Sequence, residues 1–180
     1  MDDDLIQSKY EYDLLYEQNY QLYLEHKEFD IHNVFEDIIS IYRNQFSDIY
    51  DKVIPDFIKH GIDINNERVY YGPECFLSPL QYACTTANYK LIDSLLKNGA
   101  NINDNILEIL LEYYPEYGGY DENIYRNINI FKVEECIKIL LKYGMHYTIK
   151  KDLYNNKLLI DTYSKKSDYI TDFFKLCNVI

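Results

Sequence analysis

Apolar residues recur at helical spacing along most of this chain, and residues 78–103 give the clearest case. Residues at positions i, i+3 and i+4 share one face of a helix, so two apolar stripes here predict two amphipathic helices. The first stripe consists of Leu80, Ala83 and Cys84, and the second of Leu91, Ile92, Leu95 and Leu96. One helix pair cannot bury both stripes by itself, so we expect stacked neighbours.

Polar residues mark where these two helices begin and end. Ser78 is a good N-cap, and Pro79 suits the first helical position because its missing N–H is not needed there. Gln81 follows Ser78 by three residues, which is the spacing of a reciprocal capping box. Asn88 lies in the turn between the helices. Gly99 is placed to end the second helix in a left-handed conformation.

This unit resembles an ankyrin repeat. Its Ser78-Pro79-Leu80-Gln81-Tyr82-Ala83 segment is similar to the family's T-P-L-H-x-A, with Gln81 in place of the histidine. The later segment, from Leu95 through Gly99 to Asn103, is similar to L-L-x-x-G-A-x-x-N. The resemblance implies stacked helix pairs joined by β-hairpin-like fingers, and it implies protein binding without enzymatic activity.

Residues 30–65 repeat the pattern more loosely. An amphipathic helix is predicted over 30–45 with Asn33 as its N-cap, and a second over 47–59. The segment after Gly61 is similar to the family's closing sequence. Pro55 interrupts the second helix, so we expect a kink there, or a helix that restarts with Pro55 in its first turn.

Residues 104–150 form a third unit with an insertion. An apolar helix is predicted over 106–114, ended by Pro115 and the glycines that follow, and a partner helix over 132–143. A Tyr-rich polar loop over 115–130 separates them, and the two alternatives for it are a second interaction surface and a disordered loop. The finger at 66–77 is also longer than is usual in the family.

The expected fold class is therefore all-α: an ankyrin-repeat-like solenoid of stacked helix-turn-helix pairs with irregular repeats and helical caps. Residues 1–180 are expected to form a single domain. Residues 1–29 are interpreted as an N-terminal helical cap, although an independent interaction helix is the alternative. The repeat units are predicted at 30–65, 66–103 and 104–150, and a C-terminal helical cap at 151–180.

Charge and composition narrow the class of partner. The net charge of −12 disfavours phosphate backbones, so we expect no nucleic acid, and the acidic residues 1–60 could instead steer a basic protein surface. No apolar run is long enough to predict a membrane span, and the acidic start is not a secretory signal. We therefore expect an intracellular, cytoplasmic monomer with reduced cysteines. Its Tyr-, Ile- and Asn-rich composition resembles ankyrin proteins of large amoeba-infecting DNA viruses, which would place it in host cytoplasm or a virion.

The sequence contains no recognisable catalytic chemistry. Its four histidines lack metal-ligand spacing, its cysteines form no CxxC pair, and no glycine-rich phosphate-binding motif is present. We predict no catalytic residue, no cofactor, no metal site and no enzymatic activity.

The resemblance implies that a partner protein, host or self, contacts the fingers and the exposed side of the first helices. Carried onto this sequence, the implied contact positions are Glu74, Cys75 and Leu77 on the finger, Thr85 and Thr86 near the end of the first helix, and Asn105 on the next finger. Tyr70 and Tyr71 are added as aromatic anchors, weighed equally against local packing. The alternative function is an adaptor that recruits a ubiquitin ligase or another host complex through a terminal helical segment, at 1–28 or 145–180.

Overall fold

The computed structural model describes residues 30–41, 50–72, 75–103, 105–116, 129–145, 165 and 167–176. This part of the chain is mostly helical, with one two-stranded β-hairpin. In chain order the elements are α2 (Ile31–Ile41), α3 (Tyr50–Lys59), β1 (Val69–Gly72), β2 (Cys75–Leu77), α4 (Pro79–Thr85), α5 (Tyr89–Lys97), α6 (Ile106–Glu116), α7 (Ile130–Lys142) and α10 (Asp168–Leu176). None of the described helices has the length and apolar character that crossing a membrane requires.

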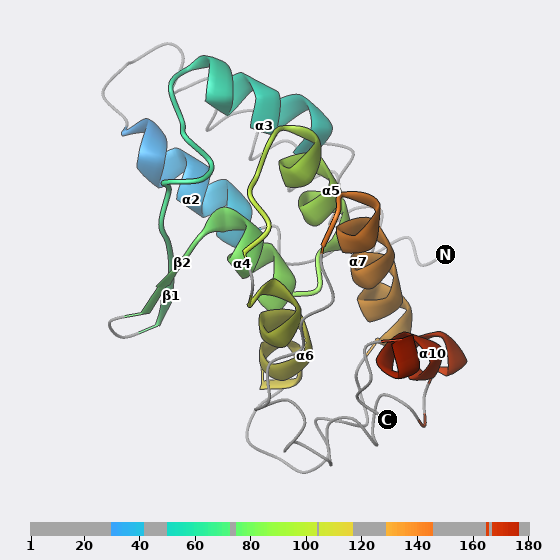
Figure 1. Cartoon of the computed structure of the whole chain (residues 1–180). Helices are drawn as coiled ribbons and strands as arrows, with labels where there is room; N and C mark the ends of the chain where they lie inside the picture. Colours follow the sequence, from blue (N-terminus) through green and yellow to red (C-terminus); the bar gives the residue numbers. More distant parts are fainter. Residues whose placement is uncertain are drawn as a thin grey trace, which may run out of the picture.

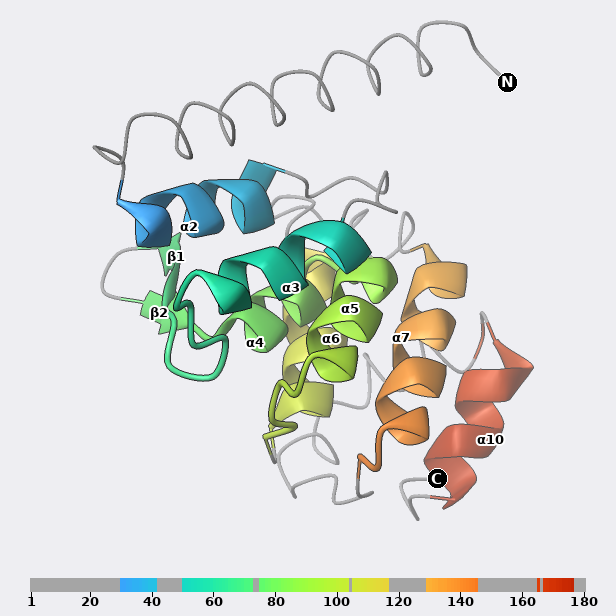
Figure 2. The same ribbon diagram turned by 90° about the horizontal axis from the view of Figure 1, so that it is seen from above.

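The helices lie in two rows (Figures 1 and 2). One row contains α2, α4 and α6, and the other contains α3, α5 and α7, with α10 beyond α7. Helix α4 packs against α5 and α6, and α5 also packs against α3 and α7. The hairpin extends from the first row, where both of its strands contact α4. We call the α2–α4–α6 row the inner row and the α3–α5–α7 row the outer row.

The α4–α5 pair forms as its sequence predicts. Ser78 and Gln81 make the reciprocal capping box at the start of α4, with Pro79 in the first turn. The Asn88 side chain accepts a hydrogen bond from the backbone N–H of Leu91 and so caps α5. Gly99 ends that helix with a φ of +91°, a conformation that costs L-residues with a side chain. Local polar signals therefore set both ends of this pair.

The structure corrects the predicted cap of α2 and excludes one of the two alternatives for Pro55, the restart of the helix. The N-cap of α2 lies three residues earlier than predicted, at Asp30 instead of Asn33, and the Asp30 carboxylate accepts from the backbone N–H of His32. Pro55 lies in the interior of α3 and does not restart the helix. Its ring is exposed, while Val53, Ile54 and Phe57 are buried, so burial of that face outweighs the hydrogen bond that proline removes.

Side chains join neighbouring helix pairs. The Asn65 amide donates to the Gly99 carbonyl at 3.1 Å, and its oxygen accepts from the Asn101 backbone N–H at 2.8 Å. The Asn88 amide donates to the hydroxyl of the buried Tyr50 at 3.1 Å. Each of these bonds links residues 50–65 to the α4–α5 unit, so the capping residues also fix how the units stack.

The last described helices follow the same rules. Asn129 caps α7, and Ser167 caps α10 while its hydroxyl donates to Glu134 on α7. Helix α6 continues through Pro115 to Glu116, slightly past the predicted end. The predicted N-terminal cap over 1–29 lies outside the described residues, as do most of the loop over 115–130 and much of the C-terminal cap over 151–180.

Candidate protein-binding surface

The hairpin presents two aromatic rings on one face. Its strands are antiparallel, with Val69 opposite Leu77 and Tyr70 opposite Phe76. Side chains alternate between the two faces of a strand, so Val69 is buried against the helices while Tyr70 and Phe76 face outward. Their exposed fractions are 53% and 56%, and the rings contact edge to face with centroids 5.8 Å apart. Large exposed aromatic pairs of this kind are typical anchors for a partner protein.

Helix α2 holds the first strand of the hairpin in place. The Glu36 carboxylate accepts from the Tyr70 backbone N–H at 2.7 Å. One turn earlier on the same helix, the His32 Nδ1 atom lies 2.8 Å from the Glu67 Oε1 atom. These two contacts attach the hairpin at its base, so the exposed rings extend from a fixed support.

A groove lies beside the hairpin, between β2, α4 and α6. Its volume is about 270 Å³, and its lining residues are Phe76, Leu77, Gln81, Thr85, Asn105, Glu108 and Ile109. The Gln81 side chain connects the start of α4 with the segment before α6. Its amide donates to the Asn105 side-chain oxygen at 3.3 Å. Its oxygen accepts from the Ser78 backbone N–H at 2.9 Å. The groove is therefore part apolar and part polar, and it spans the junction of two units.

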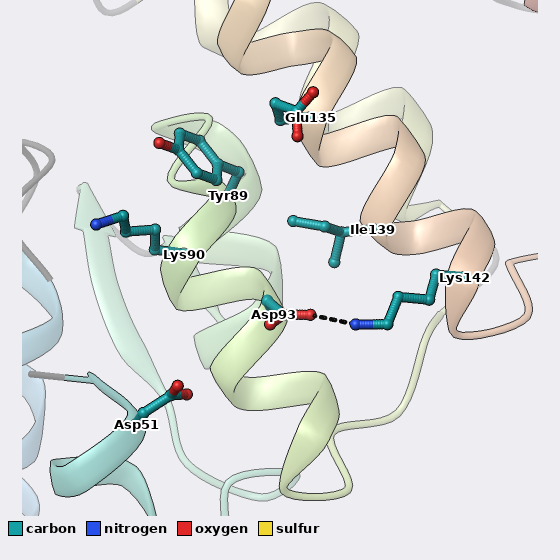
Figure 3. Close-up of a pocket in the computed structure, with 7 residues that line it drawn as sticks. All are labelled: Asp51, Tyr89, Lys90, Asp93, Glu135, Ile139 and Lys142. Carbon is teal, nitrogen blue, oxygen red and sulfur yellow. Dashed lines mark hydrogen bonds and ion pairs between the residues drawn. The ribbon is translucent and has the colours of Figure 1, made fainter. Parts of the chain in front are cut away.

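A second hollow, of about 470 Å³, lies on the outer row between α3, α5 and α7. Ion pairs cross this row: Lys142 contacts Asp93 at 3.1 Å and Lys97 contacts Asp51 at 3.4 Å. Figure 3 draws the first of these across the hollow. Each lysine precedes its closing glycine by two residues and reaches back to the preceding outer helix. We interpret this hollow as a seam between units, because its opposite charges pair within the chain; solvent screening keeps their contribution to stability small.

Comparison with known proteins decides the family of the central unit. Residues 75–104 match the family model of the ankyrin repeat. The chain contains an ankyrin repeat. Searches of curated proteins and of solved structures gave no match. Ankyrin repeats are typically non-catalytic modules for protein–protein interaction, and the matched segment includes β2, α4 and α5.

The structure places several predicted contact residues near the groove. Leu77 and Asn105 line it, and Tyr70 is exposed on the neighbouring face of the hairpin. Cys75 is half-buried on β2. Tyr71 is also half-buried and packs against the core, which favours the local-packing alternative for that residue. These placements leave Tyr70 as the exposed aromatic residue among the predicted contact positions.

The structure corrects the prediction that Thr85 is exposed on α4. It has no exposed surface, because α4 turns it inward and its hydroxyl donates to the Tyr82 carbonyl at 2.8 Å. Its role is to form the floor of the groove, not an exposed contact. Thr86 is half-buried, and its hydroxyl also donates to α4 carbonyls. Glu74 lies outside the described residues.

Sequence reasoning missed Phe76, which is the most exposed aromatic residue of the hairpin. The finger positions that the family resemblance implies are Glu74, Cys75 and Leu77, and they do not include it. Strand alternation was a signal that could have found it: if Leu77 faces the helices, Phe76 must face away. Glu108 and Ile109 on α6 were missed too, because the consensus of the unmatched third unit is too weak to align them.

Chemistry within the described residues is limited. Cys75, Cys84 and Cys136 are free thiols, and burial raises the pKa of the Cys84 and Cys136 thiols, which disfavours the reactive thiolate. No group of three His, Cys, Asp or Glu side chains in the described part of the chain lies close enough to hold a metal ion.

The contact between His32 and Glu67 predicts a pH effect at the base of the hairpin. The hydrogen bond that the Glu67 carboxylate accepts from His32 raises the pKa of His32 above its usual 6.5. A raised pKa in the folded state means that this stabilisation is fully present below pH 6.5 and is lost as pH rises through the folded pKa. NMR titration of the His32 ring should give a pKa above 6.5 that returns toward 6.5 in Glu67→Gln.

The matched control for this titration is Asp37→Asn, which removes an exposed carboxylate from the same helix without touching the pair. It should leave the His32 pKa close to the wild-type value. A wild-type pKa at or below 6.5 would contradict the described contact.

Proposed function

We propose that this chain is a non-enzymatic protein-interaction module, built as an ankyrin-type solenoid, which binds a partner protein on the surface formed by the hairpin, α4 and α6. The observation that carries the proposal is the exposed Tyr70–Phe76 pair beside the groove. The matched ankyrin repeat supports the class of activity, and the two rows of helices support stacking of units 30–65, 66–103 and 104–150.

The geometry of this surface favours a protein over a small molecule. A groove of about 270 Å³ lies below the usual size of small-molecule pockets, but it can accept one or two side chains. The two rings stand next to it on a hairpin held by Glu36 and His32. Binding would therefore require little reorganisation, which lowers the entropic cost of association.

The proposal is tested by proximity labelling in the cell that naturally makes the protein. Three forms are compared: wild type, Tyr70→Ala/Phe76→Ala, and the control Tyr89→Ala/Phe131→Ala. The control removes a second edge-to-face aromatic pair, on the outer row, in which Phe131 is 57% exposed. Specific partners should be labelled by wild type and the control, and lost with Tyr70→Ala/Phe76→Ala.

Equal labelling by all three forms would exclude the hairpin surface. Loss of partners with the control alone would move the binding surface to the outer row. Urea denaturation of both double variants shows whether each remains folded, which is expected because all the deleted rings are at least partly exposed.

A further inference from the structure

The two edges of the hairpin differ in how they are covered. Helix α2 contacts β1, and Figure 2 shows β1 beside α2 with β2 on the side away from it. The Glu36 carboxylate occupies the outer edge of β1, since it accepts from the Tyr70 backbone N–H. A register shift between Tyr70 and Gly72 also interrupts that strand. Covering an edge and bulging it are two ways in which proteins prevent further strands from pairing, and β1 has both.

The backbone of Phe76 points out from the other edge, that of β2. Tyr70 and Phe76 lie opposite each other, and the Tyr70 N–H points away from β2 to reach Glu36. In an antiparallel ladder this makes them a non-hydrogen-bonded pair, whose N–H and C=O groups face the outer edges. Outside the β1–β2 ladder, no hydrogen bond within the described part of the chain involves the Phe76 backbone. Strand β2 therefore presents one donor and one acceptor at its outer edge.

No described strand of the chain pairs with this edge. The connection before α4, residues 60–78, forms the hairpin, whereas the connection between α5 and α6 spans only residues 98–105, and its described part contains no strand. The residues of β2 are Cys75, Phe76 and Leu77, and they include neither a charge nor a proline, which natural edge strands use to prevent pairing. The outer edge of β2 is thus open beside the groove.

We propose that an extended segment of the partner protein adds to β2 as a third strand, and that one of its residues exchanges two backbone hydrogen bonds with Phe76. This inference rests on the proposed function and adds how the partner is recognised. Antiparallel pairing is expected, because it is slightly more stable per residue than parallel pairing. A partner is favoured over a second copy of this chain, because two chains that each carry a net charge of −12 repel each other.

The register of the added strand specifies its side chains. The residue opposite Phe76 lies on the same face, so an aromatic or β-branched side chain there would pack beside the Tyr70 and Phe76 rings. The residue before it lies opposite Leu77 and points to the other face. Leu77 and Ile109 line the groove there, and its volume of about 270 Å³ accepts an apolar side chain. The partner segment is therefore expected to place an apolar residue directly before an aromatic or β-branched one.

The test selects random linear peptides displayed on phage against the full chain, and a synthetic copy of an enriched peptide is titrated by fluorescence polarisation. Each peptide residue is then N-methylated in turn, which removes one backbone donor at a time. Methylation of the residue whose N–H donates to the Phe76 carbonyl should weaken binding by about tenfold or more. Methylation of its two neighbours, whose N–H groups point away from β2, should weaken it by less than about threefold.

The donor on the protein side is removed by replacing Phe76 with phenyllactic acid, its α-hydroxy analogue. This replacement keeps the ring, turns the N–H into an ester oxygen and should weaken peptide binding by about tenfold. The matched control is the same replacement at Phe131, a phenylalanine of similar exposure in the first turn of α7. A first-turn N–H has no intrahelical partner, so this control should remain folded and keep the wild-type affinity.

The outcomes distinguish this inference from the function on which it rests. Peptides that lose binding to Tyr70→Ala/Phe76→Ala but tolerate N-methylation at every residue, or that bind the Phe76 ester as tightly as wild type, overturn the inference and leave the proposed surface standing. If all enriched peptides bind Tyr70→Ala/Phe76→Ala as tightly as wild type, both are overturned. Dimerisation of the wild-type chain that the Phe76 ester abolishes, measured by size-exclusion chromatography, would assign the edge to a second copy and overturn the inference.

Discussion

Replacing Leu95 with alanine is expected to lower the free energy of unfolding by about 2–5 kcal/mol. Leu95 has no exposed surface, and its helix α5 packs against α3, α4 and α7. Truncation would leave a cavity in the core around α5, and the surrounding structure relaxes only partially into such a cavity. The loss therefore combines the transfer free energy of the deleted methyl groups with the cost of the cavity.

Leu176 provides a matched control for this experiment. It is the same residue type on α10, but 74% of it is exposed. Leu176→Ala should change the free energy of unfolding by only about 0.5 kcal/mol or less, measured by urea denaturation of both variants beside wild type. Similar small losses at both positions would mean that α5 does not lie between neighbouring units as described.

Replacing Asn88 with alanine should cost about 2–4 kcal/mol, because one side chain serves two purposes. Its oxygen caps α5 at the Leu91 backbone N–H, and its amide donates to the hydroxyl of the buried Tyr50 on α3. The first contact stabilises a helix, and the second joins two units. Alanine removes both, and the Tyr50 hydroxyl loses this donor in a site that water does not reach.

The cap and the inter-unit bond can be measured separately. Asn129→Ala removes the equivalent cap from α7 at an exposed position, so it should cost only about 1 kcal/mol. Tyr50→Phe removes the inter-unit bond and keeps the α5 cap. Urea denaturation of the three variants should place Asn88→Ala clearly above each of the others. Equal costs for Asn88→Ala and Asn129→Ala would mean that the bond to Tyr50 contributes nothing.

The α4–α5 unit could be predicted closely because its signals are local. Ser78, Gln81 and Gly99 each act within a few residues of their own position, so the sequence alone is enough to place them. The role of Asn88 was visible only in part. Its place in the turn is a sequence feature, whereas its bond to Tyr50 joins residues 38 apart and depends on how the units stack.

The start of α2 and the surface residues were harder to predict for different reasons. Asp30 and Asn33 are both good N-cap residues, so the sequence does not distinguish them, and in the structure Asp30 accepts from the His32 backbone N–H. Thr85, a predicted contact, is buried, and Phe76, which was not predicted, is exposed, because family positions say only which backbone lies near a partner. They do not say which way a side chain faces when the hairpin is longer than usual.

The two hydrogen bonds of Asn65 have a consequence for cooperativity. In stacked proteins, stability is approximately a sum of the intrinsic stability of each unit and the coupling between neighbours. Asn65 follows the α2–α3 helix pair, whereas Gly99 and Asn101 follow the α4–α5 pair, so its bonds form only when both pairs are folded. The stabilisation from these two hydrogen bonds is lost when either helix pair unfolds. The central repeat and its neighbour should therefore unfold together, although each has its own sequence signals for folding.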